Sequence, residues 1–202
     1  MKLYEFPYAP NPRRVRIFLA EKGIDVPRVH VNLMEKEHLS AAYTKINSLQ
    51  KVPALELDDG TIITESIAIC RYLEELHPTP ALFGSTAVER AQVEMWNRRM
   101  ELQIFNTIST CVFHSDPFFK DSIRQVPAMA EAAKLDNPEK WAWLDGELAD
   151  GRPFVAGKAF SVADITGMVA CGAADAFKIP IPDLPHVRRW IDRLRERPSF
   201  NA

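Results

Sequence analysis

The sequence has few of the features that mark membrane, secreted or nucleic-acid-binding proteins. None of its apolar runs is long enough to span a bilayer, and its start lacks the charged, apolar and small-residue order of a signal peptide. The formal net charge is only −2, and no basic run is interleaved with aromatic residues. These absences predict a cytoplasmic protein that binds neither nucleic acid nor membranes.

Cysteine and histidine are also scarce. The three cysteines, Cys70, Cys111 and Cys171, lie far apart among apolar neighbours, and the five histidines show no paired spacing. This pattern favours reduced thiols in the core, without disulfides. It gives no sign of a zinc site, and we therefore expect no metal.

The stretch 51–66, KVPALELDDGTIITES, contains the densest set of local signals. The Asp-Gly pair at 59–60 predicts two antiparallel strands joined by a two-residue turn. Pro53 removes one sheet donor and keeps Val52 extended, so the backbone of Val52 is available to pair with a ligand. Ser66 precedes an apolar run of helical spacing, which places it at the N-cap or in the first turn of a helix.

Together these residues match the chemistry of a short peptide ligand. A helix N-terminus with a hydroxyl, as at Ser66, attracts a carboxylate, and Glu65 can accept from an ammonium group. An amino-acid head group has both charges on one carbon, while the extended Val52 can pair with amides of the same ligand. Taken singly, each feature is more often a helix cap or a loop end, but the combination favours a peptide-binding site.

The first half of the chain alternates between strand and helix signals. Strands are expected over residues 2–6 and 29–33, with a helix between them that begins near Pro12 or Arg13 and ends at Gly23. A strand, helix, strand order predicts a parallel pair with a right-handed crossover. A short helix near 40–45 leads into the stretch 51–66. Prolines 78 and 80 end the next helix and mark a linker.

The second half has no convincing strand alternation and is expected to be all α-helical. One long helix is predicted from Ala87 to about His114, and another helical region from 122 to 149, with Pro127 near its start and a kink or break at Pro138. Ser161 and Asp164 have the spacing of a capping box. A last helix is predicted over 184–197.

The motif VPALELDDGTIITES resembles the glutathione-binding segment of glutathione transferases, and the resemblance extends over nearly the whole chain. It implies a thioredoxin-like α/β domain at 1–79, an all-helical domain at 86–202, glutathione as cosubstrate and a homodimer. By this resemblance Glu65 and Ser66 bind the γ-glutamyl group, and the backbone of Val52, with a cis bond before Pro53, binds the cysteinyl part. His38 and Lys51 resemble residues near the glycine carboxylate of glutathione.

One position departs from the family pattern. Ala9 occupies the place where many members have a serine or cysteine that lowers the pKa of the glutathione thiol. A free thiol, with a pKa near ~8.5, is only a few per cent thiolate at neutral pH. In this loop the amide of Asn11 can donate to the sulfur, although Asn11 can equally cap the helix. Tyr8 also has a suitable hydroxyl. It lies next to the position that Ala9 occupies, so its side chain should point in a different direction from the one needed to reach the sulfur.

A second set of candidates lies on the long helix. Asn106, Thr110 and His114 follow one another at four-residue intervals and share a face. A water bound by Thr110 and His114 could take the thiol proton, with the imidazole as base. The competing interpretation of His114 is a helix-end histidine whose hydrogen bonds are satisfied locally.

The sequence therefore predicts a glutathione transferase that joins the glutathione thiolate to small hydrophobic electrophiles. One alternative is glutathione-dependent disulfide reduction, which also needs no protein hydroxyl. Another is a glutathione-binding module without catalytic activity, for which Ala9 is the strongest argument. Arg13, Arg14 and Arg16 are expected to form a solvated face, although one of them can help to balance the carboxylates of the ligand.

Overall fold

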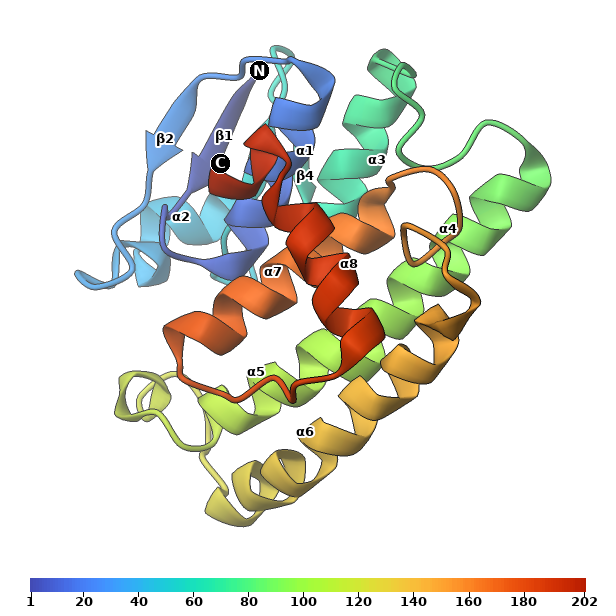
Figure 1. Ribbon diagram of the computed structural model, residues 1–202. Helices are drawn as coiled ribbons and strands as arrows, with labels where there is room; N and C mark the ends of the chain where they lie inside the picture. Colours follow the sequence, from blue (N-terminus) through green and yellow to red (C-terminus); the bar gives the residue numbers. More distant parts are fainter. The chain divides into compact units, whose positions relative to one another are not determined.

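The computed structural model describes all 202 residues, which form two compact units. Unit 1 comprises Met1–Leu82 and Pro198–Ala202, and unit 2 comprises Phe83–Arg197 (Figure 1). The predicted second domain, 86–202, included the last few residues, which the structure instead assigns to unit 1. No helix of the chain has the length and apolar character needed to cross a membrane.

Unit 1 is built on a four-stranded mixed sheet with the order β2-β1-β3-β4. The strands are β1 (Lys2–Glu5), β2 (Arg28–His30), β3 (Ala54–Glu56) and β4 (Ile62–Thr64). β1 is parallel to β2, whereas β3 is antiparallel to both β1 and β4. The parallel crossover and the antiparallel hairpin predicted from the sequence are thus confirmed, and with them the thioredoxin-like arrangement.

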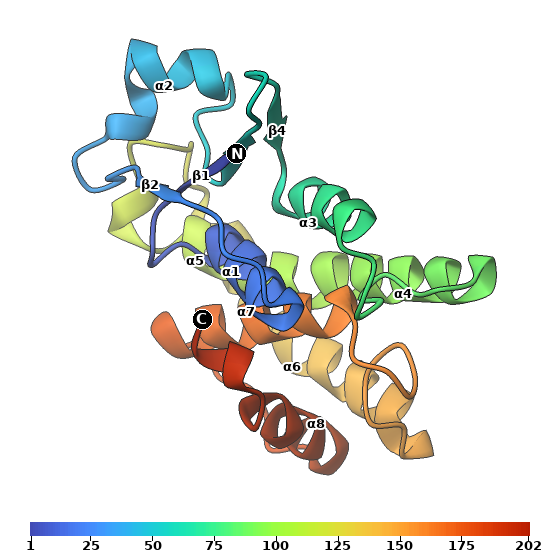
Figure 2. The same cartoon turned by 90° about the horizontal axis from the view of Figure 1, so that it is seen from above.

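The helices of unit 1 are α1 (Pro10–Lys22), the 3₁₀ turn η1 (Glu37–Leu39), α2 (Ala41–Ile46), α3 (Ser66–Leu76) and the C-terminal 3₁₀ turn η5 (Pro198–Asn201). α1 packs against α3 and against η5, so the end of the chain lies beside α1 (Figures 1 and 2). α1 begins earlier than predicted, because proline is well suited to the first turn of a helix. It ends at Lys22, and the C-cap residue Gly23 has a φ of 65°, the left-handed value expected there.

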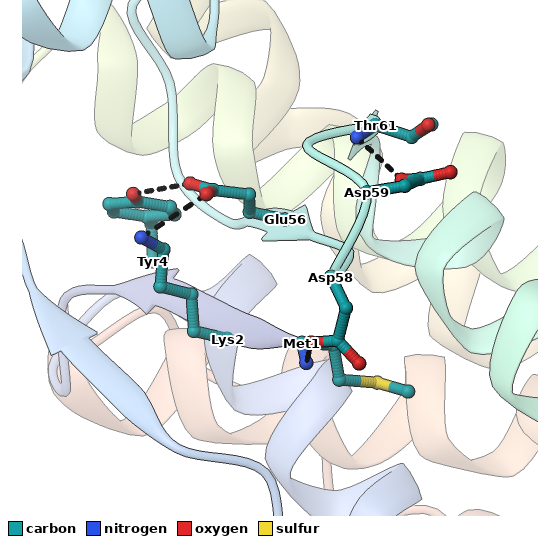
Figure 3. A network of polar contacts seen from close by, with 7 residues as sticks. All are labelled: Met1, Lys2, Tyr4, Glu56, Asp58, Asp59 and Thr61. Carbon is teal, nitrogen blue, oxygen red and sulfur yellow. Dashed lines mark hydrogen bonds and ion pairs between the residues drawn. The ribbon is translucent and has the colours of Figure 1, made fainter.

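The β3–β4 hairpin has a three-residue loop, so the predicted two-residue turn is wrong. The Gly60 N–H donates to the Leu57 carbonyl at 3.0 Å, and the Leu57 N–H donates to the Thr61 carbonyl at 2.9 Å. Gly60 has a φ of 84°, so the loop is a tight turn followed by a left-handed glycine. Asp59 Oδ1 accepts the Thr61 N–H at 2.8 Å and braces the loop (Figure 3).

Polar side chains connect β1 to β3 along one face of the sheet. The Tyr4 hydroxyl donates to a Glu56 carboxylate oxygen at 2.6 Å, and Lys2 Nζ lies 3.2 Å from the other oxygen (Figure 3). Lys2 stands opposite Glu56 in the register, and Tyr4 follows two residues later on the same face. The hydrogen bond from Tyr4 and then that from Lys2 keep the pKa of Glu56 below its usual range. These contacts stabilise the β1–β3 pairing at the end of β3 that leads into the β3–β4 loop.

The regular elements of unit 2 are all helices, as predicted, and a single isolated β-bridge joins Phe154 and Gly157. Its elements are α4 (Ala87–Arg99), the π-helical η2 (Met100–Phe105), α5 (Asn106–Phe113), η3 (Pro117–Phe119), α6 (Pro127–Glu147), η4 (Leu148–Asp150), α7 (Val162–Ala176) and α8 (Pro185–Arg195). The helix predicted from Ala87 to about His114 has the right extent, but a π-helical segment interrupts its α-helical pattern. α6 begins at Pro127, later than predicted, and continues past Pro138 without a break.

The buried helix α7 forms the centre of unit 2. The capping box predicted at its start is present: the Ser161 N–H and Oγ both donate to Asp164 Oδ2 at 3.0 Å. The Val155 N–H and Trp190 Nε1 donate to Asp164 Oδ1 at 2.9 and 3.0 Å. A Cβ on Gly167 would lie 2.4 Å from the Trp190 ring, so only glycine permits this close packing. Asp164 therefore connects α7 to α8 and to the loop that precedes α7.

Candidate functional site

The loop before β3 presents the extended segment predicted from the sequence. The Val52–Pro53 bond is cis. The backbone N–H and C=O of Val52 make no hydrogen bond within the chain. The preceding carbonyl, that of Lys51, accepts from the Tyr43 hydroxyl at 2.8 Å and from Asn47 Nδ2 at 2.7 Å. α2 and the residue that follows it thus fix the loop, while the backbone N–H and C=O of Val52 have no partner in the chain.

Glu65 and Ser66 form the junction between β4 and α3. Ser66 is the first residue of α3 and is buried, which confirms its predicted place in the first turn. Glu65 is the N-cap residue and is exposed, with φ 65° and ψ 116°. A non-glycine residue rarely adopts such a positive φ, and residues of this kind concentrate at ligand sites. The exposed Glu65 carboxylate makes no capping hydrogen bond to α3.

The N-terminus of α1 has no side-chain cap. The N-cap residue is Ala9, and Asn11 lies within the first turn, so the interpretation of Asn11 as a helix cap is wrong. Asn11 instead accepts a hydrogen bond at Oδ1 from Arg14 Nη1, at 2.7 Å. Because guanidinium groups only donate, this bond assigns the amide oxygen to Arg14 and turns the Nδ2 amino group toward other partners.

The sequence does not single out Arg14 among the three arginines, yet Arg14 connects two of the predicted residues. Its Nη1 donates to Asn11 Oδ1 and also to Ser66 Oγ, the latter at 2.6 Å. The side chain lies between α1 and α3 and is only 1% exposed. No local pattern signals this role, because Ser66 is 52 residues further along the chain.

The predicted solvated arginine face is wrong for two of its three members. Arg14 is buried, and so is Arg16, which forms an ion pair with Glu5 at 2.7 Å and donates to the Pro7 carbonyl. Arg13 is partly exposed and donates to the carbonyl of Phe200 at 2.6 Å. Successive residues of a helix point in different directions, and here each arginine meets a different neighbour.

His38 and Lys51, predicted near the glycine carboxylate, both belong to unit 1. His38 lies in η1, and its Nδ1 is buried without a hydrogen-bond partner. Burial, with a smaller effect from Lys36, lowers the pKa of His38. The side chain of Lys51 is exposed. No hydrogen bond or ion pair joins either side chain to the other predicted residues.

The next features are the three cysteines and the side chains that could bind a metal ion. All three cysteines are free and buried, as predicted. Cys70, one turn after Ser66 on α3, is completely buried, and burial raises the pKa of its thiol to about 12. It therefore stays a neutral thiol. No group of three or more histidine, cysteine or acidic side chains is arranged to bind a metal ion.

The polar residues predicted on the long helix use hydrogen bonds within unit 2. The Thr110 hydroxyl donates to the Asn106 carbonyl of its own helix at 2.8 Å. His114 is the C-cap of α5, and its Nδ1 accepts the Val126 N–H at 3.1 Å. The neutral imidazole then has its proton on Nε2, and the acceptor nitrogen is occupied. A role as base would require the bond from Val126 to break.

Comparisons with known proteins give a consistent result. Two family models match, "Glutathione S-transferase, N-terminal domain" over residues 3–81 and "Glutathione S-transferase, C-terminal domain" over residues 103–198. Glutathione S-transferase 2 of Saccharomyces cerevisiae is 34% identical, over 98% of this chain and 87% of that protein. The chain belongs to the glutathione transferase family. This glutathione transferase also resembles the maleylacetoacetate isomerase of Pseudomonas aeruginosa, with 44% identity over 99% of this chain and 93% of that protein.

Solved structures confirm the fold of this glutathione transferase. The crystal structure of Gtt2 from Saccharomyces cerevisiae superposes with a TM-score of 0.93 and 35% identity, over 100% of this chain and 99% of that chain. A Gtt2-class glutathione S-transferase of Vibrio parahaemolyticus gives a TM-score of 0.85 at 38% identity, over 100% of this chain and 96% of that chain. The predicted family, fold class and transferase class of enzyme are confirmed, and the family uses glutathione as cosubstrate.

Proposed function

We propose that this glutathione transferase stabilises the thiolate of bound glutathione and transfers it to small hydrophobic electrophiles. The observation that supports this most directly is the orientation of the Asn11 amide. Arg14 occupies its oxygen, so its amino group can donate to a sulfur anion. Asn11 would thereby replace the serine or cysteine that is missing at Ala9.

Glutathione binding is proposed to use the residues of unit 1 identified above. Ser66, at the first position of α3, donates to the γ-glutamyl carboxylate, and exposed Glu65 pairs with the ammonium group. The backbone of Val52, beside Pro53, pairs with the cysteinyl amide groups. His38 and Lys51 are proposed to contact the glycine carboxylate, and the exposed Lys51 side chain supplies the positive charge.

Thiolate formation is proposed to depend on the start of α1. The first N–H groups of a helix carry a partial positive charge that favours an anion, and the N-cap Ala9 provides no side chain that competes for them. The Asn11 amino group adds a hydrogen bond to the sulfur. The thiol proton passes to solvent, and the thiolate forms a bond to the electrophilic carbon while the leaving group departs with its electron pair.

Thr110 and His114 are proposed to have a smaller part in thiol activation. Thr110 donates to a backbone carbonyl, and the acceptor nitrogen of His114 is engaged with Val126. A water-mediated base at His114 would first have to give up that hydrogen bond. Both residues remain candidates for contacts with the electrophile.

An aromatic cluster of unit 2 supports the preference for apolar electrophiles. Phe113 and Phe119 pack edge to face with centroids 4.7 Å apart, and Phe118 packs on Phe119 at 4.9 Å. Phe113 and Phe118 remain 42% and 46% exposed, although large aromatic side chains are usually more deeply buried. These rings offer an apolar surface to a flat substrate.

Isomerisation is the second candidate function, because a relative named maleylacetoacetate isomerase is 44% identical. A thiolate that adds to a cis double bond and then leaves allows rotation without consuming glutathione, so the same activation would serve. Disulfide reduction and binding without catalysis are further alternatives. Rates with an aromatic halide, a maleyl compound and a small disulfide, each with glutathione, would separate them. We expect the aromatic halide to react fastest, and a faster maleyl reaction would favour the isomerase.

The family also supports a homodimer that acts in detoxification in the cytoplasm. We infer these properties from the resemblance. Sedimentation should give about twice the chain mass of 22.9 kDa, whereas the mass of a single chain at working concentration would contradict the dimer.

A further inference from the structure

Arg14 is placed to influence both ends of the proposed glutathione site without touching the ligand. Its Nη1 lies 2.7 Å from Asn11 Oδ1 on α1 and 2.6 Å from Ser66 Oγ on α3. The residue is only 1% exposed. By contrast, Arg13 reaches Phe200 and Arg16 reaches Glu5, both outside the proposed site.

The chemistry of guanidinium determines how its partners are oriented. The two hydrogens of Nη1 can only be donated, so Asn11 Oδ1 and Ser66 Oγ both act as acceptors toward Arg14. The Ser66 hydroxyl hydrogen must then point away from Arg14, and so must the Asn11 amino group. Without Arg14, the hydroxyl could rotate and the amide could turn its oxygen outward.

We propose that Arg14 is a positioning residue that fixes Ser66 and Asn11 as hydrogen-bond donors toward glutathione. Ser66 then donates to the γ-glutamyl carboxylate, and Asn11 donates to the thiolate. An outward-turned amide oxygen would repel a sulfur anion, whereas the amino group stabilises it. The inference rests on the proposed roles of Asn11 and Ser66.

The direct test is Arg14→Met, which keeps an unbranched side chain but removes the donors. The apparent pKa of the bound glutathione thiol is followed by thiolate absorbance, and the dissociation constant by calorimetry. We expect the pKa to rise by about one unit and the dissociation constant to rise about tenfold. Arg13→Met is the matched control on the same helix and should change neither quantity. Unchanged values for a folded Arg14→Met variant would overturn the inference.

Double variants separate positioning from general loosening of the site. In an Asn11→Ala background, Arg14→Met should no longer raise the thiol pKa. In a Ser66→Ala background, it should no longer weaken glutathione binding. If the full effects of Arg14→Met persist in both backgrounds, Arg14 does not act through these residues, and the inference is wrong.

A second variant leaves Arg14 in place, so the inference can be tested even if Arg14→Met does not fold. Asn11→Asp keeps an acceptor for Arg14 but has no amino group. We expect its melting temperature to be retained while the bound thiol pKa rises. If Asn11→Asp instead leaves the thiol pKa unchanged, Asn11 does not present a donor, and the inference fails.

The outcomes also distinguish this inference from the proposed function. If the wild-type protein leaves the thiol pKa at its free value, thiol activation itself is contradicted, and the role of Arg14 at Asn11 is contradicted with it. Its role at Ser66 is then decided by the dissociation constant of Arg14→Met. If the wild type lowers it and Asn11→Ala abolishes that effect, but Arg14→Met does not, only the role of Arg14 is wrong.

Discussion

Three arginines close together on α1 have three different environments. Arg13 contacts η5, Arg14 contacts α3, and Arg16 pairs with Glu5 of β1. The sequence predicts the helix and shows the cluster of charge, but the partners lie far away in the chain. Arg14 is buried beside α3, and a buried guanidinium requires such polar partners.

Substitutions of Asn11 and His114 are expected to affect kcat/KM to different extents. Asn11→Ala removes the proposed donor to sulfur, so kcat/KM for conjugation should fall about tenfold, equivalent to about 1.4 kcal/mol. His114→Ala removes an acceptor for the Val126 N–H and the smaller contribution proposed for this side chain, so kcat/KM should change by less than about twofold. Steady-state kinetics at neutral pH would measure both.

The reverse result would reassign thiol activation to unit 2. A large loss in His114→Ala, with a native melting temperature and little effect of Asn11→Ala, would mean that the bond from Val126 breaks during catalysis. Thr110→Val would then be expected to reproduce part of that loss.

Residues within a local motif were easier to predict than residues brought together by folding. The place of Ser66 in the first turn of α3 follows from a polar residue before an apolar run, and the structure confirms it. The bond between His114 and Val126 depends on the path of the chain between α5 and α6, which has no periodic pattern. The hydrogen bonds from Arg14 to Asn11 and Ser66 also depend on how the chain folds and have no local sequence pattern.

At the level of elements, hydrophobic periodicity located most helices and strands but not their details. The hairpin was predicted, yet its loop has three residues because Leu57 and Thr61 form the last pair. The long helix was predicted, yet Met100–Phe105 is π-helical. A single Asp-Gly pair does not determine loop length, and an apolar stripe does not distinguish α-helical from π-helical turns.

The capping box of α7 makes the stability of the protein depend on pH. Burial raises the pKa of Asp164 from about 3.8 to about 6, although four hydrogen bonds to the carboxylate act in the other direction. Between these values the folded protein binds a proton that the unfolded chain has lost. This stabilisation is fully present below the unfolded pKa and is lost as the pH rises through the folded pKa.

Asp164→Asn should therefore be more destabilising in acid than at neutral pH. The difference in the free energy of unfolding between wild type and variant should be about 1.4 kcal/mol larger at pH 5 than at pH 7.5. Urea unfolding at the two pH values measures it. Asp136→Asn, at an exposed position of α6, is the control. A difference of the opposite sign would show that Asp164 stays ionised in the fold.

At the level of the whole molecule, the sequence predicts the two-unit fold but not where the end of the chain lies. The secondary structure of each unit can be predicted from local patterns, and the family models and the solved relatives confirm the fold. The return of Pro198–Ala202 to unit 1 was not predicted, because it depends on Arg13 meeting Phe200 across most of the chain. The relatives are named both transferase and isomerase, so the family alone does not identify the substrate.

The central claim is that this protein activates the glutathione thiol without a serine, cysteine or tyrosine at position 9. The most direct test is the apparent pKa of the thiol of glutathione bound to saturating wild-type protein, followed by thiolate absorbance across pH. We predict a value at least one unit below that of free glutathione, which corresponds to about 1.4 kcal/mol of preferential thiolate stabilisation. A value equal to that of free glutathione would contradict the account and favour a binding protein that leaves the thiol unactivated.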